Sequence, residues 1–168
     1  MNVAGVPQSL ARLIPGLWLG LLLCVAGVAT PATFALLAQA DAGRVVGRIL
    51  GQEASISLGL GVAVLVLERL AARRAAEAGR GSQFSVGMAL ALGAIFCTVF
   101  GYYGLQPQMA AAKAGLGALG GGLPFGLPFG LSFGQLHILS AVFYAAKVVL
   151  VALLAWRAAA APIRPPSS

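Results

Sequence analysis

The sequence predicts an all-α integral membrane protein, with four transmembrane helices in one bundle and both termini in the cytoplasm. Hydrophobic residues make up 60% of the 168 residues and charged residues only 9%, whereas a soluble domain has about a quarter of its residues charged. The apolar residues fall into four segments, and the basic residues gather at the ends of these segments. Together these observations exclude an ordinary soluble domain. The net charge of +7 therefore indicates topology signals rather than a nucleic-acid surface.

The four segments predict spans at about residues 13–37, 53–71, 84–105 and 135–156, within a single membrane domain of residues 1–168. A helix needs about 20 residues to cross a hydrocarbon core of about 30 Å, and all but the second segment reach this length. The uncharged part of the second segment, between Glu53 and Glu68, is too short by about two turns. We therefore expect Glu53 or Glu68 at the hydrocarbon edge. The first span contains Pro31 and is longer than a signal-peptide core, so it is expected to remain as an anchor.

The basic residues predict the orientation. With four spans, the loop after the second span lies on the same side as both termini, and this side carries seven arginines. The opposite side carries three basic residues, Arg44, Arg48 and Lys113. The positive-inside rule places the more basic side in the cytoplasm, as in a multi-pass protein of the bacterial inner (plasma) membrane. Aromatic belts are then expected at Trp18 and Trp156 on the inner side and at Tyr102 and Tyr103 on the outer side.

Two outer connections differ in kind. Residues 41–51 are expected to form a short amphipathic helix that lies flat in the outer interface, with Asp41 as its cap and Arg44 and Arg48 toward water. Residues 106–134 contain the repeat GLPFGLPFGLSFG, in which proline or glycine recurs every two residues, so we expect an irregular loop at the interface. The repeat either contacts the bilayer or a neighbouring subunit, or is an insert with no role.

A stripe of polar residues marks the fourth segment. His137, Ser140, Tyr144 and Lys147 are separated by three, four and three positions, which places them on one helical face that can point into the bundle. Lys147 lies about 15 Å deeper than His137, at 1.5 Å per residue. A lysine near the midplane is costly unless it is paired or hydrated, so Lys147 requires a partner.

Two interpretations of this stripe are open. In the structural one, Ser140 and Tyr144 form hydrogen bonds across helices, and Lys147 binds backbone carbonyls that are freed near Pro31. In the functional one, the stripe lines a path for a proton, a metal ion or a small solute. Glu53 then completes the path at its outer mouth, where it is expected to meet His137.

The sequence offers no chemistry for an enzyme. A single histidine cannot form a bis-histidine haem site, and no set of nucleophile, base and orienting residue is visible, so no catalytic, cofactor or metal residues are predicted. Gly16 and Gly20 form a GxxxG pattern that lets another helix approach closely.

Several short motifs, taken in order, carry a resemblance to a known family. They are WLG at Trp18–Gly20, Pro31 with Phe34, Tyr103 with Pro107, and LHxLS at Leu136–Ser140. The chain resembles the bacterial family DUF4149, which is related to eukaryotic transmembrane protein 205. This resemblance implies a small four-span protein, and the eukaryotic relative is associated with tolerance of platinum drugs. It implies no catalytic residue, and the phenylalanine repeat departs from the family's usual polar segment.

The expected function follows from these features. The sequence favours a non-enzymatic accessory or scaffolding subunit of a larger membrane assembly, with the lipid bilayer and protein subunits or a homo-oligomer as partners, and no nucleic acid. The alternative is a small oligomeric transporter or a metal- or solute-tolerance factor, with a polar path along the fourth span. Four short spans can hardly enclose a solute path alone, so this alternative requires an oligomer.

Overall fold

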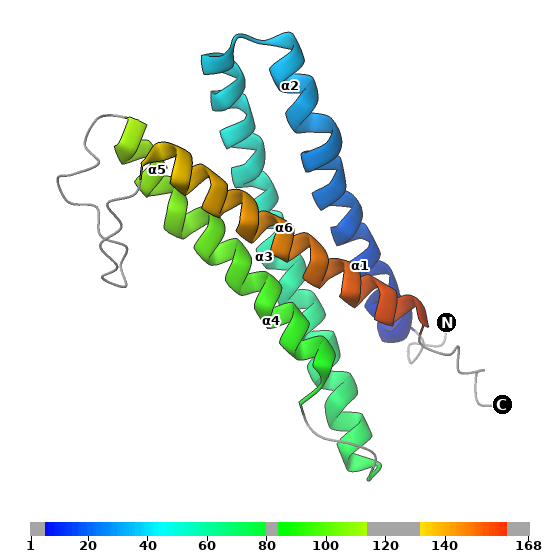
Figure 1. Cartoon of the computed structure of the whole chain (residues 1–168). Coiled ribbons are helices and arrows are strands. Elements are labelled where there is room, and N and C mark those ends of the chain that lie inside the picture. The colour runs from blue at the N-terminus through cyan, green and yellow to red at the C-terminus, as the bar shows by residue number, and fades with distance from the viewer. Residues whose placement is uncertain (1–5, 80–83, 114–131, 161–168) are drawn as a thin grey trace.

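Four long helical segments make up most of the described part of the chain (Figure 1). The computed structural model describes residues 6–79, 84–113 and 132–160. The bounds of the first two spans are α1 (Val6–Cys24), the π-helical segment η1 (Val25–Ala29) and α2 (Thr30–Leu36), followed by α3 (Gln39–Glu77). Those of the other two are α4 (Val86–Thr98), the π-helical segment η2 (Val99–Gly104) and α5 (Leu105–Lys113), followed by α6 (Phe133–Ala160). All four segments are long and apolar enough to cross a bilayer, which confirms the four-span prediction.

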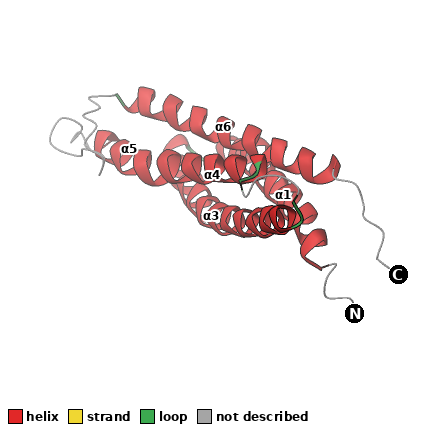
Figure 2. Ribbon diagram, turned by 90° about the horizontal axis from the view of Figure 1, so that it is seen from below, coloured by secondary structure: helices red, strands yellow, loops and turns green. Residues whose placement is uncertain are grey.

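The helices form two hairpins that cross each other. α1 packs against α3, and α4 against α6; between the hairpins, α1 packs against α6 and α3 against α4. Within the described residues no close backbone contact joins α3 to α6, which are therefore diagonal in the bundle. The hairpins diverge toward the end that carries α2 and α5 (Figure 1), and a view from below shows α4 and α6 over α3 (Figure 2). α1 begins at the end of the bundle where α6 stops; that this end is cytoplasmic stays a prediction.

The apolar core fills the half of the bundle in which α1 begins and α6 ends. Trp18 and Leu22 from α1 are fully buried there, together with side chains from the other three long helices. The buried members of this cluster are Trp18, Leu22, Val64, Ala91, Ala94, Val151 and Leu154. Small residues on α4 let the neighbouring helices approach, so the core is narrow and tightly packed. The interfacial position predicted for Trp18 is wrong, because its indole lies in this core; Trp156 is exposed, and its interfacial position stays a prediction.

α3 corrects the prediction of a flat interfacial helix at residues 41–51. These residues form the first turns of one continuous helix of 39 residues, Gln39–Glu77, about 58 Å long at 1.5 Å per residue. No proline interrupts this stretch, and Ala42 and Val46 are buried where α3 packs against α2. The apolar face of the segment therefore covers the first span instead of the bilayer surface. Asp41 does not cap the helix but pairs with Arg44.

The connection predicted as a loop at residues 106–134 begins as a helix. Leu105 and Met109 of α5 are buried against Leu136 of α6, and this contact holds residues 105–113 in helical form. The helix thus continues past η2 for two further turns. The Gly/Pro/Phe repeat itself lies outside the described residues.

The space around each glycine shows whether it packs against another helix inside the bundle or lies on the outer surface. A Cβ atom built on Gly101 would lie 2.9 Å from the Cβ of Phe143 on α6. In the described part of the chain nothing lies within 4 Å of a Cβ atom on Gly16 or Gly20. The GxxxG pattern therefore does not pack a helix inside the bundle, and it points outward, where both glycines are exposed.

We expect Gly101→Ala to lower the free energy of unfolding by about 1–2 kcal/mol, because the Cβ atom of Phe143 moves only with its backbone and the two helices must separate. Gly16→Ala is the matched control. The new methyl group meets no neighbour in the bundle. The substitution is expected to raise the free energy of unfolding by at most about 1 kcal/mol, because alanine has a higher helix propensity than glycine. Unfolding in detergent measures both changes. An equal effect of the two substitutions would contradict this assignment of packing glycines.

Candidate functional site

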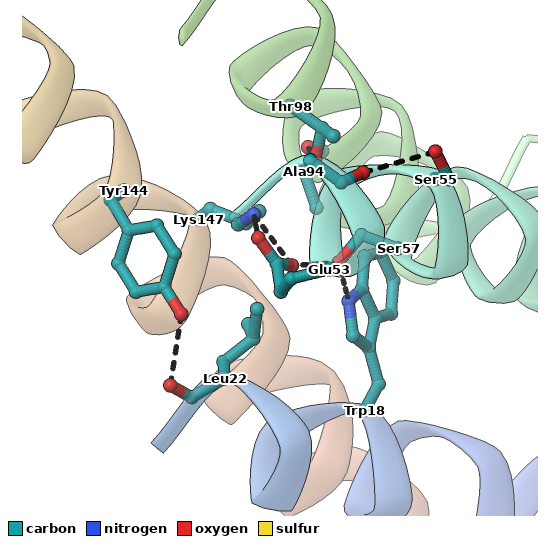
Figure 3. A network of polar contacts seen from close by, with 10 residues as sticks. Trp18, Leu22, Glu53, Ser55, Ser57, Ala94, Thr98, Tyr144 and Lys147 are labelled. Atoms are coloured by element: carbon teal, nitrogen blue, oxygen red, sulfur yellow. Dashed lines mark hydrogen bonds and ion pairs between the residues drawn. The ribbon is translucent and has the colours of Figure 1, made fainter. Parts of the chain in front are cut away.

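A buried ion pair joins the two diagonal helices. The Nζ atom of Lys147 on α6 lies 2.9 Å from both Oε1 and Oε2 of Glu53 on α3 (Figure 3). The two side chains are only 4% and 2% exposed. Lys147 lies near the middle of α6, so the pair sits deep in the bundle, where either charge alone would be very costly. The bond crosses the bundle centre where α3 and α6 make no close backbone contact.

Two hydrogen bonds extend the pair to α1. The Ser57 hydroxyl, one turn after Glu53 on the same face of α3, donates to Oε1 of that carboxylate. The indole Nε1 of Trp18 on α1 donates to Ser57 Oγ at 2.8 Å (Figure 3). Ser57 accepts one bond and donates the next, so its orientation is fixed. The carboxylate thus receives hydrogen bonds from both Ser57 and Lys147.

Tyr144 forms a second link between α6 and α1. Its hydroxyl donates to the Leu22 carbonyl at 2.9 Å, and the Lys147 Nζ lies 4.7 Å from the centre of its ring. This distance is within the range of a cation–π interaction. In the described residues, every buried side-chain nitrogen or oxygen has a hydrogen-bond partner. The network therefore locks α1, α3 and α6 without leaving a polar atom unsatisfied.

A small cavity lies beside the ion pair. Its volume is about 40 Å³, and residues from α3, α4, η2, α5 and α6 line it: Leu50, Glu53, Cys97, Thr98, Gly101, Tyr102, Gln106, Ser140, Tyr144 and Lys147. Its lining is mostly apolar by area but includes the charged groups of Glu53 and Lys147, and the space holds about one or two water molecules. A metabolite-sized solute does not fit.

A groove on the outside of the bundle adjoins this cavity. It has a volume of about 770 Å³ and is lined by Arg48, Gly51, Gln52, Ser55, Ile56, Tyr102 and Tyr103. Tyr102 lines both spaces, so they adjoin at this residue. Its hydroxyl lies against Gly51, where any Cβ atom would collide with it. The hydroxyls of Ser55 and Tyr103 are 3.3 Å apart.

Both π-helical segments border the site. η2 carries Gly101 and Tyr102, which line the cavity. η1 begins three residues after Leu22, the residue that accepts the bond from Tyr144. Pro31, which cannot donate a backbone hydrogen bond, lies near the start of α2 just after η1. π-helical turns inside α-helices are frequent at functional sites.

The structure brings most of the predicted stripe together but corrects its pairing. Ser140, Tyr144 and Lys147 line the cavity with Glu53, and the cross-helix bond expected of Tyr144 is confirmed. The predicted contact between Glu53 and His137 is wrong, as is the binding of Lys147 to carbonyls near Pro31. His137 is exposed and stacks on Phe133, with ring centres 6.2 Å apart.

The error has a physical cause. α3 begins at Gln39, so Glu53 lies well inside its span instead of at the outer start. This places the carboxylate level with Lys147, about ten residues and 15 Å along α6 from His137.

Sequence reasoning missed two members of the network, Trp18 and Ser57. Ser57 had a usable signal, since Glu53, Ser57 and Gly61 recur every four residues and so share one helical face. That spacing indicates a polar and small face turned toward the bundle. Trp18 had no such signal, because a tryptophan near a span end also suits an interfacial belt.

Comparison with known proteins identifies the family. Residues 13–117 match the model described as a domain of unknown function, DUF4149. The match includes Trp18, Glu53 and Ser57 and ends before α6, which supplies Tyr144 and Lys147. No curated protein and no solved structure matches the chain. Since the family model covers more than half of the sequence, and the four apolar helices are present, the chain belongs to the DUF4149 family of membrane proteins.

Proposed function

We propose that the protein is a non-enzymatic accessory or scaffolding subunit of a larger assembly in the bacterial inner (plasma) membrane. The observation that carries this proposal is the buried, ion-paired polar centre. Glu53 and Lys147 neutralise each other, and the cavity beside them holds only about one or two waters. Such a centre fixes the relative positions of the helices and so gives the bundle a constant outer surface.

That surface includes a place for a partner helix. Gly16 and Gly20 of α1 are exposed, and nothing in the described chain lies within 4 Å of a Cβ atom on either. Paired small residues let two helix backbones approach closely in a membrane, where packing rather than water exclusion drives association. α1 is therefore the helix through which the protein would join its assembly.

The test is purification of the tagged chain from its native membrane in mild detergent. We expect a larger complex of fixed stoichiometry, which Gly16→Leu with Gly20→Leu releases without a change in the melting temperature of the purified chain. Gly59→Leu is the matched control, because Gly59 is also exposed in a span and has no neighbour within 4 Å. If the complex survives both sets of substitutions, the glycine face is not the contact. A chain that elutes alone would contradict the subunit role.

A second candidate is a small oligomeric transporter or a solute-tolerance factor with a polar path along α6. One observation favours it: the cavity at the ion pair and the outer groove meet at Tyr102. Below the ion pair the apolar cluster around Trp18 and Val151 fills the bundle, so a single chain offers no path through. Transport would require several copies. A homo-oligomer with no other subunit, in the same purification, would favour this candidate.

A further inference from the structure

The charges on α3 indicate how deep the outer groove lies in the bilayer. Between Arg48 and Glu68 there are 19 residues, and Glu53 is the only charged one among them. Nineteen residues of helix span about 28 Å, close to the hydrocarbon thickness of about 30 Å. Since Glu53 is buried and paired, Arg48 and Glu68 mark the two hydrocarbon edges of this helix. Arg48 therefore lies at the level of the lipid headgroups.

Arg48 also gives the groove an unbalanced positive charge. It is exposed, and it takes part in neither the Arg44–Asp41 nor the Lys147–Glu53 ion pair. The other side chains that line the groove are uncharged: Gln52, Ser55, Ile56, Tyr102 and Tyr103. The groove therefore presents a guanidinium beside the Gln52 amide, with no lining carboxylate, while the Ser55 hydroxyl donates to the Gly51 carbonyl. This donor set suits the oxygens of a phosphodiester.

The polar residues continue below the headgroup level. Gln52 lies one turn deeper than Arg48, about 6 Å toward the membrane centre, and Ser55 about 10 Å. Both are exposed, and an amide that faces acyl chains alone loses its hydrogen bonds at a cost of several kcal/mol. The ester carbonyls of a glycerophospholipid lie just below its phosphate and can accept these bonds. Ile56 and the ring of Tyr103 then offer an apolar surface to an acyl chain.

We propose that this groove between α3 and η2 binds an anionic glycerophospholipid, with its phosphate on Arg48 and an ester carbonyl on the Gln52 amide. Basic sites between membrane helices are a known means of lipid headgroup recognition. Gly51 contributes by letting the Tyr102 hydroxyl lie against the α3 backbone, which places Tyr102 in the lining of the groove. The proposal does not depend on the subunit role.

Native mass spectrometry of the purified chain tests the site. Phosphatidylglycerol and phosphatidylcholine are titrated separately against the wild-type chain, Arg48→Gln and Arg44→Gln. We expect one phosphatidylglycerol to be retained with a preference over phosphatidylcholine, and Arg48→Gln to weaken it about fivefold to tenfold. Arg44→Gln removes the same charge one turn farther out, where the guanidinium is already paired with Asp41, and is expected to leave the affinity unchanged. Equal weakening by both substitutions would overturn the site, because it would show general attraction of anions.

Two further arms define the ligand. Glycerol 3-phosphate, which lacks acyl chains, is not expected to displace the lipid at millimolar concentration; displacement would indicate a free-phosphate site instead. Gln52→Leu keeps Arg48 but removes the amide at the carbonyl level, and is expected to weaken phosphatidylglycerol and phosphatidylcholine alike. A lipid-free dimer that Arg48→Gln dissociates would show that a second copy occupies the groove, and would refute the proposal.

Discussion

Lys147→Met is expected to lower the free energy of unfolding by about 3–5 kcal/mol, because it leaves the Glu53 carboxylate buried and without its counter-charge. Methionine has nearly the length of lysine and is apolar, so little packing is lost. The remaining hydrogen bond from Ser57 cannot replace a full charge. Denaturation of the purified protein in mixed micelles, followed by circular dichroism, measures the change.

The double variant Glu53→Gln with Lys147→Met separates charge from packing. Removing both charges is expected to restore most of the lost stability, because replacing a buried ion pair by neutral groups is often nearly neutral. The cycle should therefore show a large coupling energy between the two positions. His137→Ala serves as the control, since His137 is exposed on the same helix, and should change the stability little. Equal losses in the single and double variants would refute the pairing.

A double variant with nearly wild-type stability would also indicate the structural role of the ion pair. If the fold survives without the charges, the pair does not hold the bundle together by net energy. It instead selects one arrangement of helices, since any slip of α3 against α6 would leave both charges unpaired in a low-dielectric interior. Loss of the native complex in a double variant that remains stable would connect this selection to assembly.

The sequence predicted the number of spans because membrane physics constrains it strongly. A run of about 20 apolar residues has few other uses, and backbone groups in hydrocarbon must be satisfied within a helix. The polar stripe on α6 was also predictable, since Ser140, Tyr144 and Lys147 share a face by helical spacing alone. Their position on the inner face of α6 could be predicted without knowing which helix lies next to it.

The pairing could not be predicted in the same way. A charge within a span looks the same in a sequence whether it lies at the hydrocarbon edge or is buried with a partner on another helix. A prediction that begins the second span at Glu53 therefore makes the helix too short and places the carboxylate too far outward. The packing of the helices decides which of them lie diagonally in the bundle. A single sequence contains no pattern that indicates this arrangement.

Trp18 is the other position where a large effect is expected. Its side chain is fully buried at the centre of the apolar cluster, and its Nε1 is bonded to Ser57. Lipid tails are as apolar as this core, so removing the ring forfeits mainly packing contacts and the hydrogen bond. We expect Trp18→Ala to cost about 3–5 kcal/mol and Trp18→Phe, which keeps most of the ring volume, about 1–2 kcal/mol. The same denaturation experiment measures both.

Trp156 provides the matched control, because the chain has two tryptophans and this one is 77% exposed. Trp156→Ala should change the stability little, and Trp156→Phe leaves Trp18 as the sole indole. Its emission should then be blue-shifted and resistant to a water-soluble quencher, as a dry, hydrogen-bonded core position requires. Red-shifted, readily quenched emission from Trp18 would place the indole at the interface after all. Trp18 donates a hydrogen bond to Ser57, and Ser57 donates one to Glu53. That result would therefore also mean that no hydrogen bond links α1 to the ion pair through Trp18.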